Sequence, residues 1–232
     1  MAGTVNRTIQ ILSSLAAELA NLLKEVLNRA LGLVDFVGCL LGWLPPKKLR
    51  LRVAVLQDEA GNPLADESVV DLAVAEATRV FWQEAHTRIV PVGGQIVVTL
   101  DAAAPAAALN VRCGMGAWAE DFGEAGAYFR RRAAYNLSGT LLGYGAPVTA
   151  FVVRDIVGKG GCSLGILADH VTVDIPALAG PGPRVLTHEV AHACGLWHSK
   201  DGSNLMFPSG PGDSLSRWQR AILRSSRHVT YL

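Results

Sequence analysis

The clearest pattern in the chain is a helical spacing of apolar residues over positions 8–44. Apolar residues recur there at intervals of three and four, which places them along one face of a helix: Ile9, Leu12, Ala16, Leu19, Leu23, Val26, Ala30, Leu33, Val37, Leu40 and Leu44. We expect an amphipathic helix, or a helical hairpin broken near Gly32, that packs on the rest of the chain. A helix on a membrane surface and a membrane-spanning helix are the alternatives. The second is disfavoured because the most apolar stretch is short and has Asp35 in its middle.

Pro45-Pro46 ends this pattern and marks a domain boundary, so that residues 1–46 form an N-terminal helical segment and residues 47–232 a second domain. Apolar runs and alternation predict strands over residues 49–57, 95–101, 148–155, 162–168 and 171–175. Helical spacing predicts helices over residues 66–86, with Asp66 as the N-cap, 183–194 and 215–226. The Ala- and Gly-rich residues 102–147 are expected to be a long loop region with a short helix. This order of elements favours an α+β fold.

Composition and charge exclude several classes of protein. Half of the 232 residues are hydrophobic and 18% are charged, which is too apolar for a disordered chain and enough for a core. The chain has 21 Lys and Arg against 20 Asp and Glu, so its charge gives no indication of nucleic-acid binding. The N-terminal residues do not form a convincing signal peptide. Secretion by another route, association with a membrane and a cytoplasmic location all stay open.

The four cysteines are widely spaced and include no C-x-x-C pair, which argues against a zinc ribbon or a dithiol redox motif. They are Cys39, Cys113, Cys162 and Cys194. A bridge between Cys113 and Cys162 is conceivable because both lie in Gly-rich stretches. Free, buried thiols are the alternative.

Candidate chemistry is concentrated in residues 188–198, which read His-Glu-Val-Ala-His-Ala-Cys-Gly-Leu-Trp-His. In a helix, His188 and His192 lie one turn apart on the same face, where two imidazoles can bind one zinc ion. Glu189 can then reach a water molecule at the metal without being a ligand. Gly195 permits a left-handed turn that ends the helix and lets His198 approach as the third ligand. Three histidines leave a fourth position open for water, as catalytic zinc requires.

This pattern is unlike a chance cluster of histidines on a helix surface. The chain has 24 Gly and 6 His among 232 residues, so the added Gly and His at fixed positions are a coincidence on the order of 1 in 400. Half of the six histidines fall within these eleven residues. A metal site is therefore the favoured interpretation.

The motif H-E-x-x-H-x-x-G-x-x-H followed by a methionine resembles the signature of the metzincin zinc peptidases. Met206 follows His198 by eight residues, within the sequence Asn-Leu-Met-Phe-Pro. That short spacing is similar to the matrixin branch. The resemblance implies a catalytic domain over residues 47–232 with a twisted mixed sheet, a long helix, an active-site helix, a Met-turn and a C-terminal helix. It also implies that Met206 forms an apolar floor under the zinc ligands and is not itself a ligand.

The same resemblance suggests where a substrate would bind. An extended peptide would pair with an edge strand shortly before the active-site helix, and Leu164, Gly165 and Ile166 are the candidates. Phe207 and Pro208, after the Met-turn, would form the wall of the main specificity pocket. No charge occurs in residues 203–211, so we expect a neutral or apolar residue after the cleaved bond.

The sequence thus predicts a zinc-dependent endopeptidase with one catalytic Zn²⁺ ion and a peptide or protein substrate. Glu189 would be the general base that takes a proton from zinc-activated water. Two alternatives stay open: a zinc hydrolase acting on a non-protein substrate, and a catalytically latent or degenerate binding or membrane-associated protein on the same fold. Residues 1–46 could be a pro-segment, an anchor or a packing element, and the oligomeric state does not follow from the sequence.

Overall fold

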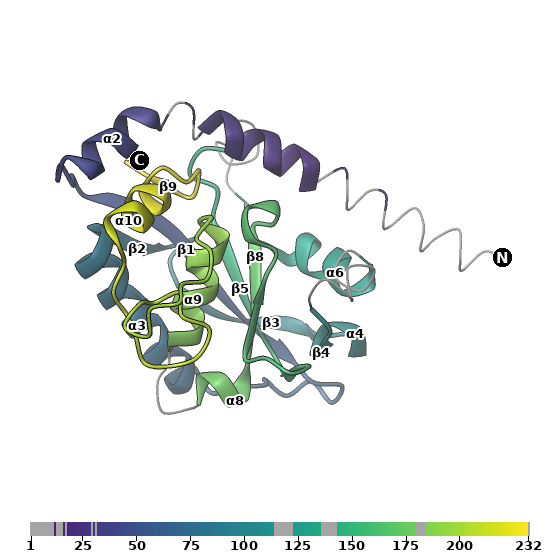
Figure 1. Ribbon diagram of the computed structural model, residues 1–232. Coiled ribbons are helices and arrows are strands. Elements are labelled where there is room, and N and C mark those ends of the chain that lie inside the picture. The colour runs from purple at the N-terminus through teal and green to yellow at the C-terminus, as the bar shows by residue number, and fades with distance from the viewer. Residues whose placement is uncertain are drawn as a thin grey trace.

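The computed structural model describes residues 12, 16, 18–28, 30, 32–113, 123–135, 143–179 and 184–231. Position 9 of the N-terminal stripe and position 183, where the predicted active-site helix starts, lie outside these residues. A seven-stranded mixed sheet forms the centre, and helices cover both of its faces (Figure 1). The prediction of a mixed sheet together with a long helix is confirmed.

Most neighbouring strands of the sheet run parallel, in the order β2-β1-β5-β8-β7, with β3 and β9 also paired to β1. The strands are β1 (Lys47–Gln57), β2 (Thr87–Pro91), β3 (Val97–Ala103), β5 (Val148–Val153), β7 (Gly161–Ser163), β8 (His170–Asp174) and β9 (Val229–Thr230). Only β7, against β8, and β9, against β1, pair antiparallel among the described strands of this sheet. Strand β7 lies at the end of this order, beside β8.

The helices surround this sheet, and a small second sheet pairs β4 (Asn110–Val111) with β6 (Asp155–Ile156). The labelled helices are α2 (Leu33–Leu40), α3 (Glu67–Ala85), α4 (Ala106–Leu109), α6 (Glu124–Arg132), α8 (Ile175–Leu178), α9 (Arg184–Ala193), α10 (Arg217–Arg224) and the 3₁₀ turn η1 (Gly165–Leu167). Residues 18–28 form a further helix, called here the N-terminal helix. In the part of the chain that the structure describes, no helix is long and apolar enough to cross a membrane.

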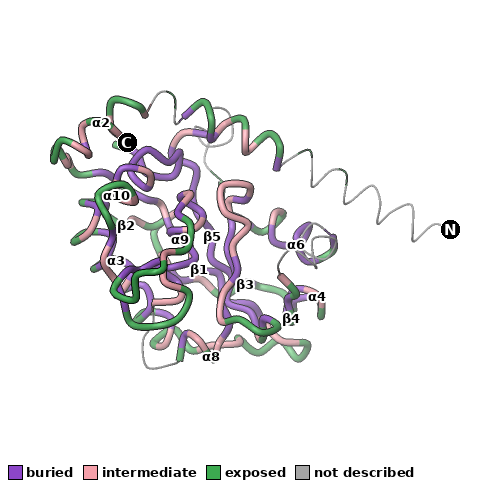
Figure 2. Tube along the Cα trace, viewed as in Figure 1, coloured by how far each residue is buried: buried purple, intermediate pink, exposed green. Residues whose placement is uncertain are grey.

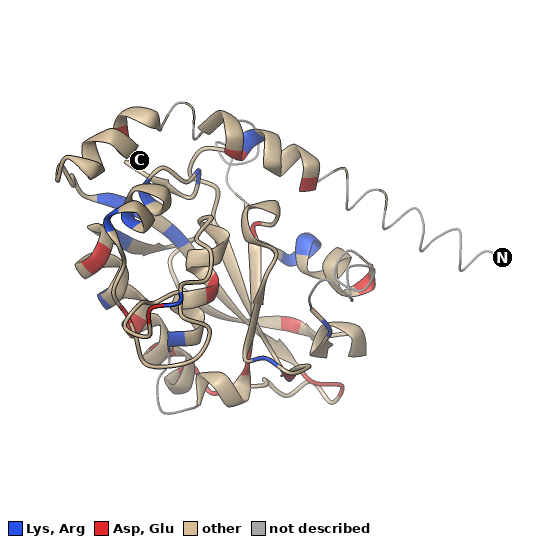
Figure 3. Cartoon of the chain, in the orientation of Figure 1, with Lys and Arg blue, Asp and Glu red and all other residues tan. Residues whose placement is uncertain are grey.

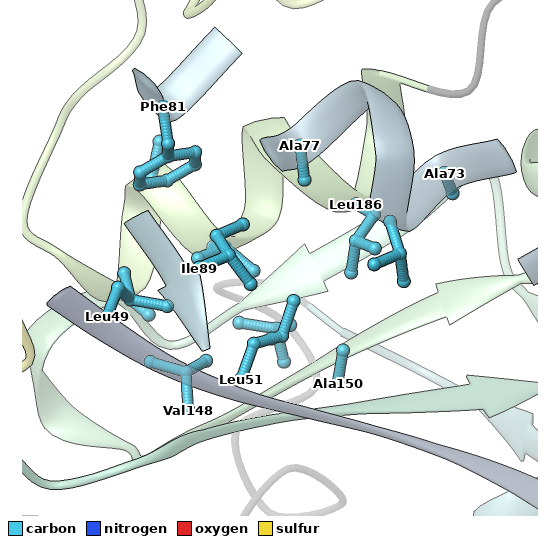
Figure 4. Close-up of a cluster of buried hydrophobic side chains, with 14 of the residues drawn as sticks. Leu49, Leu51, Ala73, Ala77, Phe81, Ile89, Val148, Ala150 and Leu186 are labelled. Carbon is cyan, nitrogen blue, oxygen red and sulfur yellow. The ribbon is translucent and has the colours of Figure 1, made fainter. Parts of the chain in front are cut away.

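The burial pattern of strand β1 indicates that both faces of the sheet are covered by other parts of the protein. Its first half alternates, with Leu49 and Leu51 buried and Lys48 exposed, whereas residues 53–56 are all buried. Such a continuous buried run is typical of a parallel strand covered on both faces. One face packs against α3 and α9 in a large apolar cluster, in which Phe81 and Leu186 on the helices face the strand residues Leu49 and Leu51 (Figure 4). The other face packs against α4 and α6.

Most predicted elements are present, with several differences. Strands β2 and β9 and the short helix α8 were not predicted, and residues 102–147, expected as a loop region with one short helix, contain α4, β4 and α6. The predicted strand over residues 162–168 is wrong, because β7 ends at Ser163 and η1 follows it. The Ser163 hydroxyl accepts the Gly165 backbone N–H at 3.0 Å, and Gly165 adopts a left-handed φ of +61°. A hydroxyl that closes such a turn competes with strand pairing and ends the strand.

Two of the four cysteines form the bridge that the sequence made conceivable, and the other two are free, buried thiols. Cys113 and Cys162 form a disulfide with their Cα atoms 6.3 Å apart, and the bridge ties residue 113 to strand β7. Cys39 and Cys194 are free and buried.

The N-terminal helix and α2 lie against the body of the protein, but with the opposite face to the one expected. Their apolar side chains point to solvent, and Leu23, Val34 and Leu41 are exposed to 72%, 75% and 82%. Figure 2 shows this exposed outer side along the top of the molecule. We name these side chains the outer apolar face: Leu19, Leu23, Val26, Leu27, Leu33, Val34, Val37 and Leu41. The segment thus packs on the rest of the chain as expected, but most of its apolar stripe faces solvent, which the prediction did not foresee.

The contact with the body combines polar side chains with Phe36 and the buried Cys39 of α2. Glu25 is fully buried and pairs with the equally buried Arg227 at 3.4 Å. Glu18 lies 3.6 Å from Arg130, and burial raises the pKa of Glu18 to about 7 although Arg130 opposes this shift. In Figure 3 the two helices are mostly tan, with a few red bands and a blue one. The segment is thus held by ionic contacts that the helical period alone does not reveal.

We expect Arg227→Met to lower the free energy of unfolding by about 3–5 kcal/mol, because it leaves buried Glu25 without this partner. Asp169, which also pairs with Arg227, loses the same contact. Urea denaturation followed by circular dichroism measures the change. Arg217→Met, which alters an exposed arginine on α10, is the matched control and should change stability by less than about 0.5 kcal/mol. Equal effects of the two substitutions would contradict the role of the buried pair.

Candidate metal centre

The centre is built on helix α9 and the turn that follows it. Buried Leu186 and Val190 seat the helix on the sheet, which leaves His188 and His192 together on another face. Helix α9 ends at Ala193, and Gly195 has a φ of +90°, the left-handed conformation that the sequence predicted. The Gly195 N–H donates to the His192 carbonyl at 2.8 Å, which closes the turn. The chain then returns with His198 beside the helix.

The structure brings the three predicted histidines together. The Nε2 atom of His192 lies 3.1 Å from Nε2 of His188 and 3.1 Å from Nε2 of His198. In the part of the chain that the structure describes, they are the one group of His, Cys, Asp or Glu side chains placed to hold a metal ion. His188 is buried, His192 is half-buried and His198 is exposed, so the group opens toward solvent on the His198 side.

Hydrogen bonds on the far side of two rings fix which nitrogen faces the centre. The Nδ1 atom of His188 lies 2.8 Å from the Leu205 carbonyl, and that of His192 lies 2.7 Å from the Leu196 carbonyl. A carbonyl only accepts, so each Nδ1 carries the proton and each Nε2 presents a lone pair. Burial lowers the pKa of His188 to about 4, and it lowers that of His192 as well. Both rings are therefore neutral near pH 7, as metal ligands must be.

This donor set fits a zinc ion. Tetrahedral zinc with Zn–N bonds of about 2.0–2.1 Å separates its nitrogen ligands by about 3.3 Å. The observed separations of 3.1 Å are close to this value. Lone pairs that face each other at such distances repel unless a cation lies between them. The arrangement is therefore suited to a bound cation.

Glu189 lies beside this group, on the same helix and next to His188. It is 7% exposed, and burial raises the pKa of its carboxyl group to about 8, while Lys159 lowers it. The carboxylate packs on the backbone of Gly161 in strand β7: a Cβ atom added to Gly161 would lie 2.6 Å from Oε1 of Glu189. The absence of a side chain at position 161 thus leaves room for the acid, and no pattern in the sequence predicts this contact.

The loop with Met206 is tied to the centre by backbone groups. Met206 is fully buried in the large apolar cluster. Its carbonyl accepts the Ser199 N–H at 2.8 Å, which links it to the segment directly after His198. Asn204 and Gln219 exchange amide hydrogen bonds at 2.7 and 3.0 Å, which ties the loop to α10. These contacts hold the Leu205 carbonyl where it can accept from His188.

Arg184 is a residue of the site that sequence reasoning missed. It lies one helical turn before His188, and its guanidinium donates to the Phe207 carbonyl at 2.8 Å and also to the carbonyls of Leu205 and Gly210. Its spacing of four residues from His188 was a signal that could have placed it on the same face. The carbonyls that it binds belong to a distant loop, and no side-chain pattern predicts them.

The predicted substrate residues lie around this group without forming the expected strand. Leu164, Gly165 and Ile166 lie at and within η1, directly after β7 and in contact with α9. Phe207 is half-buried and Pro208 is exposed, both in the loop that Arg184 holds. The edge strand in contact with Glu189 is therefore β7, which ends at Ser163, directly before the predicted substrate residues.

Comparisons with known proteins give one loose structural likeness. No model of a known protein family matches the chain, and no curated protein matches it. Among solved structures, the chain is similar to metalloproteinase-II from Bacteroides fragilis, with a TM-score of 0.47 and 13% sequence identity. The likeness covers 78% of this chain and 54% of that chain, so this chain spans about half the length of its neighbour. This likeness is too loose to indicate a function for this chain.

We expect the purified protein to bind one zinc ion per chain at the three histidines. Substituting His188 or His198 by alanine should weaken zinc binding by more than the roughly 10- to 100-fold that loss of an outer hydrogen-bond partner costs. Competition with a fluorescent zinc chelator measures the affinity. His86→Ala, at an exposed histidine on another part of the surface, is the control and should leave it unchanged. Unaltered affinity in the His188 and His198 variants would contradict the assignment.

Proposed function

We propose that the protein is a zinc-dependent endopeptidase with a metzincin-type site. The observation that carries the proposal is the convergence of three histidine Nε2 atoms next to Glu189, an acid on the same helix. Imidazole ligands suit several transition metals, and zinc is the one that three neutral histidines with an open position hold most often in hydrolases. The sequence motif supports the same choice.

His188, His192 and His198 would hold the zinc ion, and the Nδ1 bonds of His188 and His192 to backbone carbonyls would keep those two rings in place. Zinc bound there would supply Lewis-acid polarisation of the scissile carbonyl and lower the pKa of water. Glu189 would accept a proton from the attacking water through a carboxylate oxygen and donate it to the leaving amine nitrogen. Helix α9, seated on the core, keeps base and ligands in one rigid frame.

Strand β7 supports a peptide as the substrate. It is an edge strand that pairs with β8 on one side, and Gly161 at its start contacts Glu189. An extended peptide added along this edge would have its backbone beside the general base. Phe207 and Pro208 would face the residue after the cleaved bond, and we propose that this residue is neutral or apolar.

We expect Glu189→Ala to keep bound zinc and to lose the cleavage of denatured casein by a factor of about 10²–10⁴, because the proton acceptor is removed. A chelator should abolish cleavage by the parent protein, and added zinc should restore it. Glu67→Ala, which alters an exposed glutamate on α3, is the matched control and should cleave like the parent. Zinc content by mass spectrometry and product release from casein are the measurements.

Three outcomes would count against the proposal. If Glu189→Ala cleaves as well as the parent, the assigned general base is wrong. If parent and variant both bind zinc and neither cleaves any protein, a binding role or a non-protein substrate is favoured. If cleavage survives complete removal of the metal, the zinc mechanism is excluded.

A second expectation concerns the support of Glu189. Gly161→Ala should reduce kcat by about 10- to 100-fold, because the new methyl group displaces the Glu189 carboxylate while the histidines keep their places. Zinc content should stay the same. Gly202→Ala is the matched control, since a Cβ atom there meets nothing within 4 Å. An unchanged kcat in Gly161→Ala would show that the observed position of Glu189 is not the active one.

A further inference from the structure

The outer apolar face has no partner within the described chain, and it is too continuous to be a scatter of single exposed residues. It spans two consecutive helices on one side of the molecule (Figures 1 and 2). Amphipathic helices on soluble domains turn their apolar side to the core. Here the helices are reversed, and a reversal of this extent marks an interaction surface.

The reversal is specified by contacts and is not a loose placement of the segment. Asp35 of α2 pairs with the nearly buried Lys47 of β1 at 2.8 Å, and Lys47 also donates to the Arg224 carbonyl at 2.8 Å. Glu25 of the N-terminal helix reaches the fully buried Arg227. Turning either helix over would bury aliphatic side chains but would leave these charges unpaired inside the protein. The body is therefore built to receive the polar side of the segment.

The charges around this face favour a lipid surface as its occupant. The acids of the segment, Glu18, Glu25 and Asp35, are all turned inward and paired with basic residues of the body. Cations on elements that contact α2 are exposed instead: Lys48 on β1 and Arg217 on α10. An uncharged aliphatic centre with exposed cations near it complements an anionic bilayer, whose headgroups attract Lys and Arg.

Aromatic side chains beside α2 also favour a lipid surface as the occupant. Trp218 of α10 is 61% exposed, and its ring lies 5.5 Å from that of Phe36 in α2. Trp43 is 60% exposed and packs over Gly38 of α2, where an added Cβ atom would lie 2.9 Å from the indole. Tryptophan is enriched where protein meets the headgroup layer of a membrane.

We propose that the outer apolar face lies on the surface of an anionic lipid bilayer, with Trp43 and Trp218 at headgroup level and Lys48 and Arg217 facing the lipid phosphates. The protein then attaches through residues 18–43 while the body stays in water. Asn21, on the inward side of the N-terminal helix, lies 3.5 Å from the Leu167 carbonyl of η1. The attached segment thus contacts the turn that borders α9.

Flotation of the full-length chain with vesicles tests the proposal. The vesicles contain phosphatidylcholine with about one third phosphatidylglycerol, and phosphatidylcholine alone is the neutral comparison. The parent should float with the anionic vesicles. Leu23→Glu combined with Val37→Glu, one charge on each helix, should reduce the bound fraction at least about tenfold. Leu72→Glu, at a leucine on α3 that is 65% exposed, is the matched control and should bind like the parent.

The cationic part of the proposal has its own variant. Lys48→Gln combined with Arg217→Gln should weaken binding to anionic vesicles by about tenfold or more and leave binding to neutral vesicles unchanged. Thermal unfolding and zinc content establish that each variant is folded. Should Leu23→Glu with Val37→Glu unfold the protein, Leu23→Gln with Val37→Gln replaces it.

Several results would overturn the proposal. The parent fails to float with anionic vesicles at physiological salt, or the Leu23 and Val37 variants float as well as the parent. Sedimentation could instead show a dimer that the same two substitutions dissociate. In that case a second copy of the chain, not lipid, covers the outer apolar face.

Discussion

The Nε2 atom of His192 lies 3.1 Å from those of His188 and His198, and a bound cation would offset the repulsion between lone pairs that face one another at this distance. Much of the described structure around helix α9 serves this one constraint. The helix supplies His188 and His192 one turn apart, the left-handed Gly195 turns the chain back, and His198 closes the group. Two carbonyls from different loops hold the Nδ1 protons away from the centre. Without those two hydrogen bonds either ring could rotate or present a protonated nitrogen, and the site would lose its affinity for a cation.

The core of the protein makes this arrangement rigid. Helix α9 packs against β5, β7 and β8 and against helix α3, so its position is set by the sheet and not by the metal. The same packing brings Glu189 against Gly161 on the edge strand, where an acid next to an open backbone edge is suited to act on a peptide. Arg184 adds a brace from the start of α9 to the loop that carries Leu205 and Phe207. Ligands, base and proposed substrate edge therefore move as one body.

Local patterns predicted much of this, and the failures have physical causes. The spacing of His188 and His192 and the conformational freedom of Gly195 are properties of short segments, and the sequence contains them. Strand β2 is only five residues long and ends in proline, so its pattern is too short to separate from a loop. The strand expected over residues 162–168 ends early because the Ser163 hydroxyl closes a turn. The carbonyls that Arg184 and His188 bind lie on a loop about 20 residues further along the chain, and backbone groups leave no trace in the residue types.

The N-terminal segment shows most clearly that a local sequence pattern does not predict long-range contacts. A helical period identifies an apolar face but does not say whether that face meets the core, another molecule or a membrane. The orientation of the segment is set by buried ion pairs such as that of Arg227 with Glu25, which lie about 200 residues apart in the chain. The placement of the segment thus depends on long-range ion pairs, whereas the metal centre depends mostly on contacts within about 30 residues.

The most direct test of the central claim is X-ray absorption at the zinc edge of the purified protein loaded with zinc. Convergence of the three Nε2 atoms predicts a first coordination sphere of three imidazole nitrogens and one oxygen, at about 2.0–2.1 Å. The imidazole scattering should be reduced in His188→Ala. A sphere that contains sulfur, or one made only of oxygen, would contradict the account.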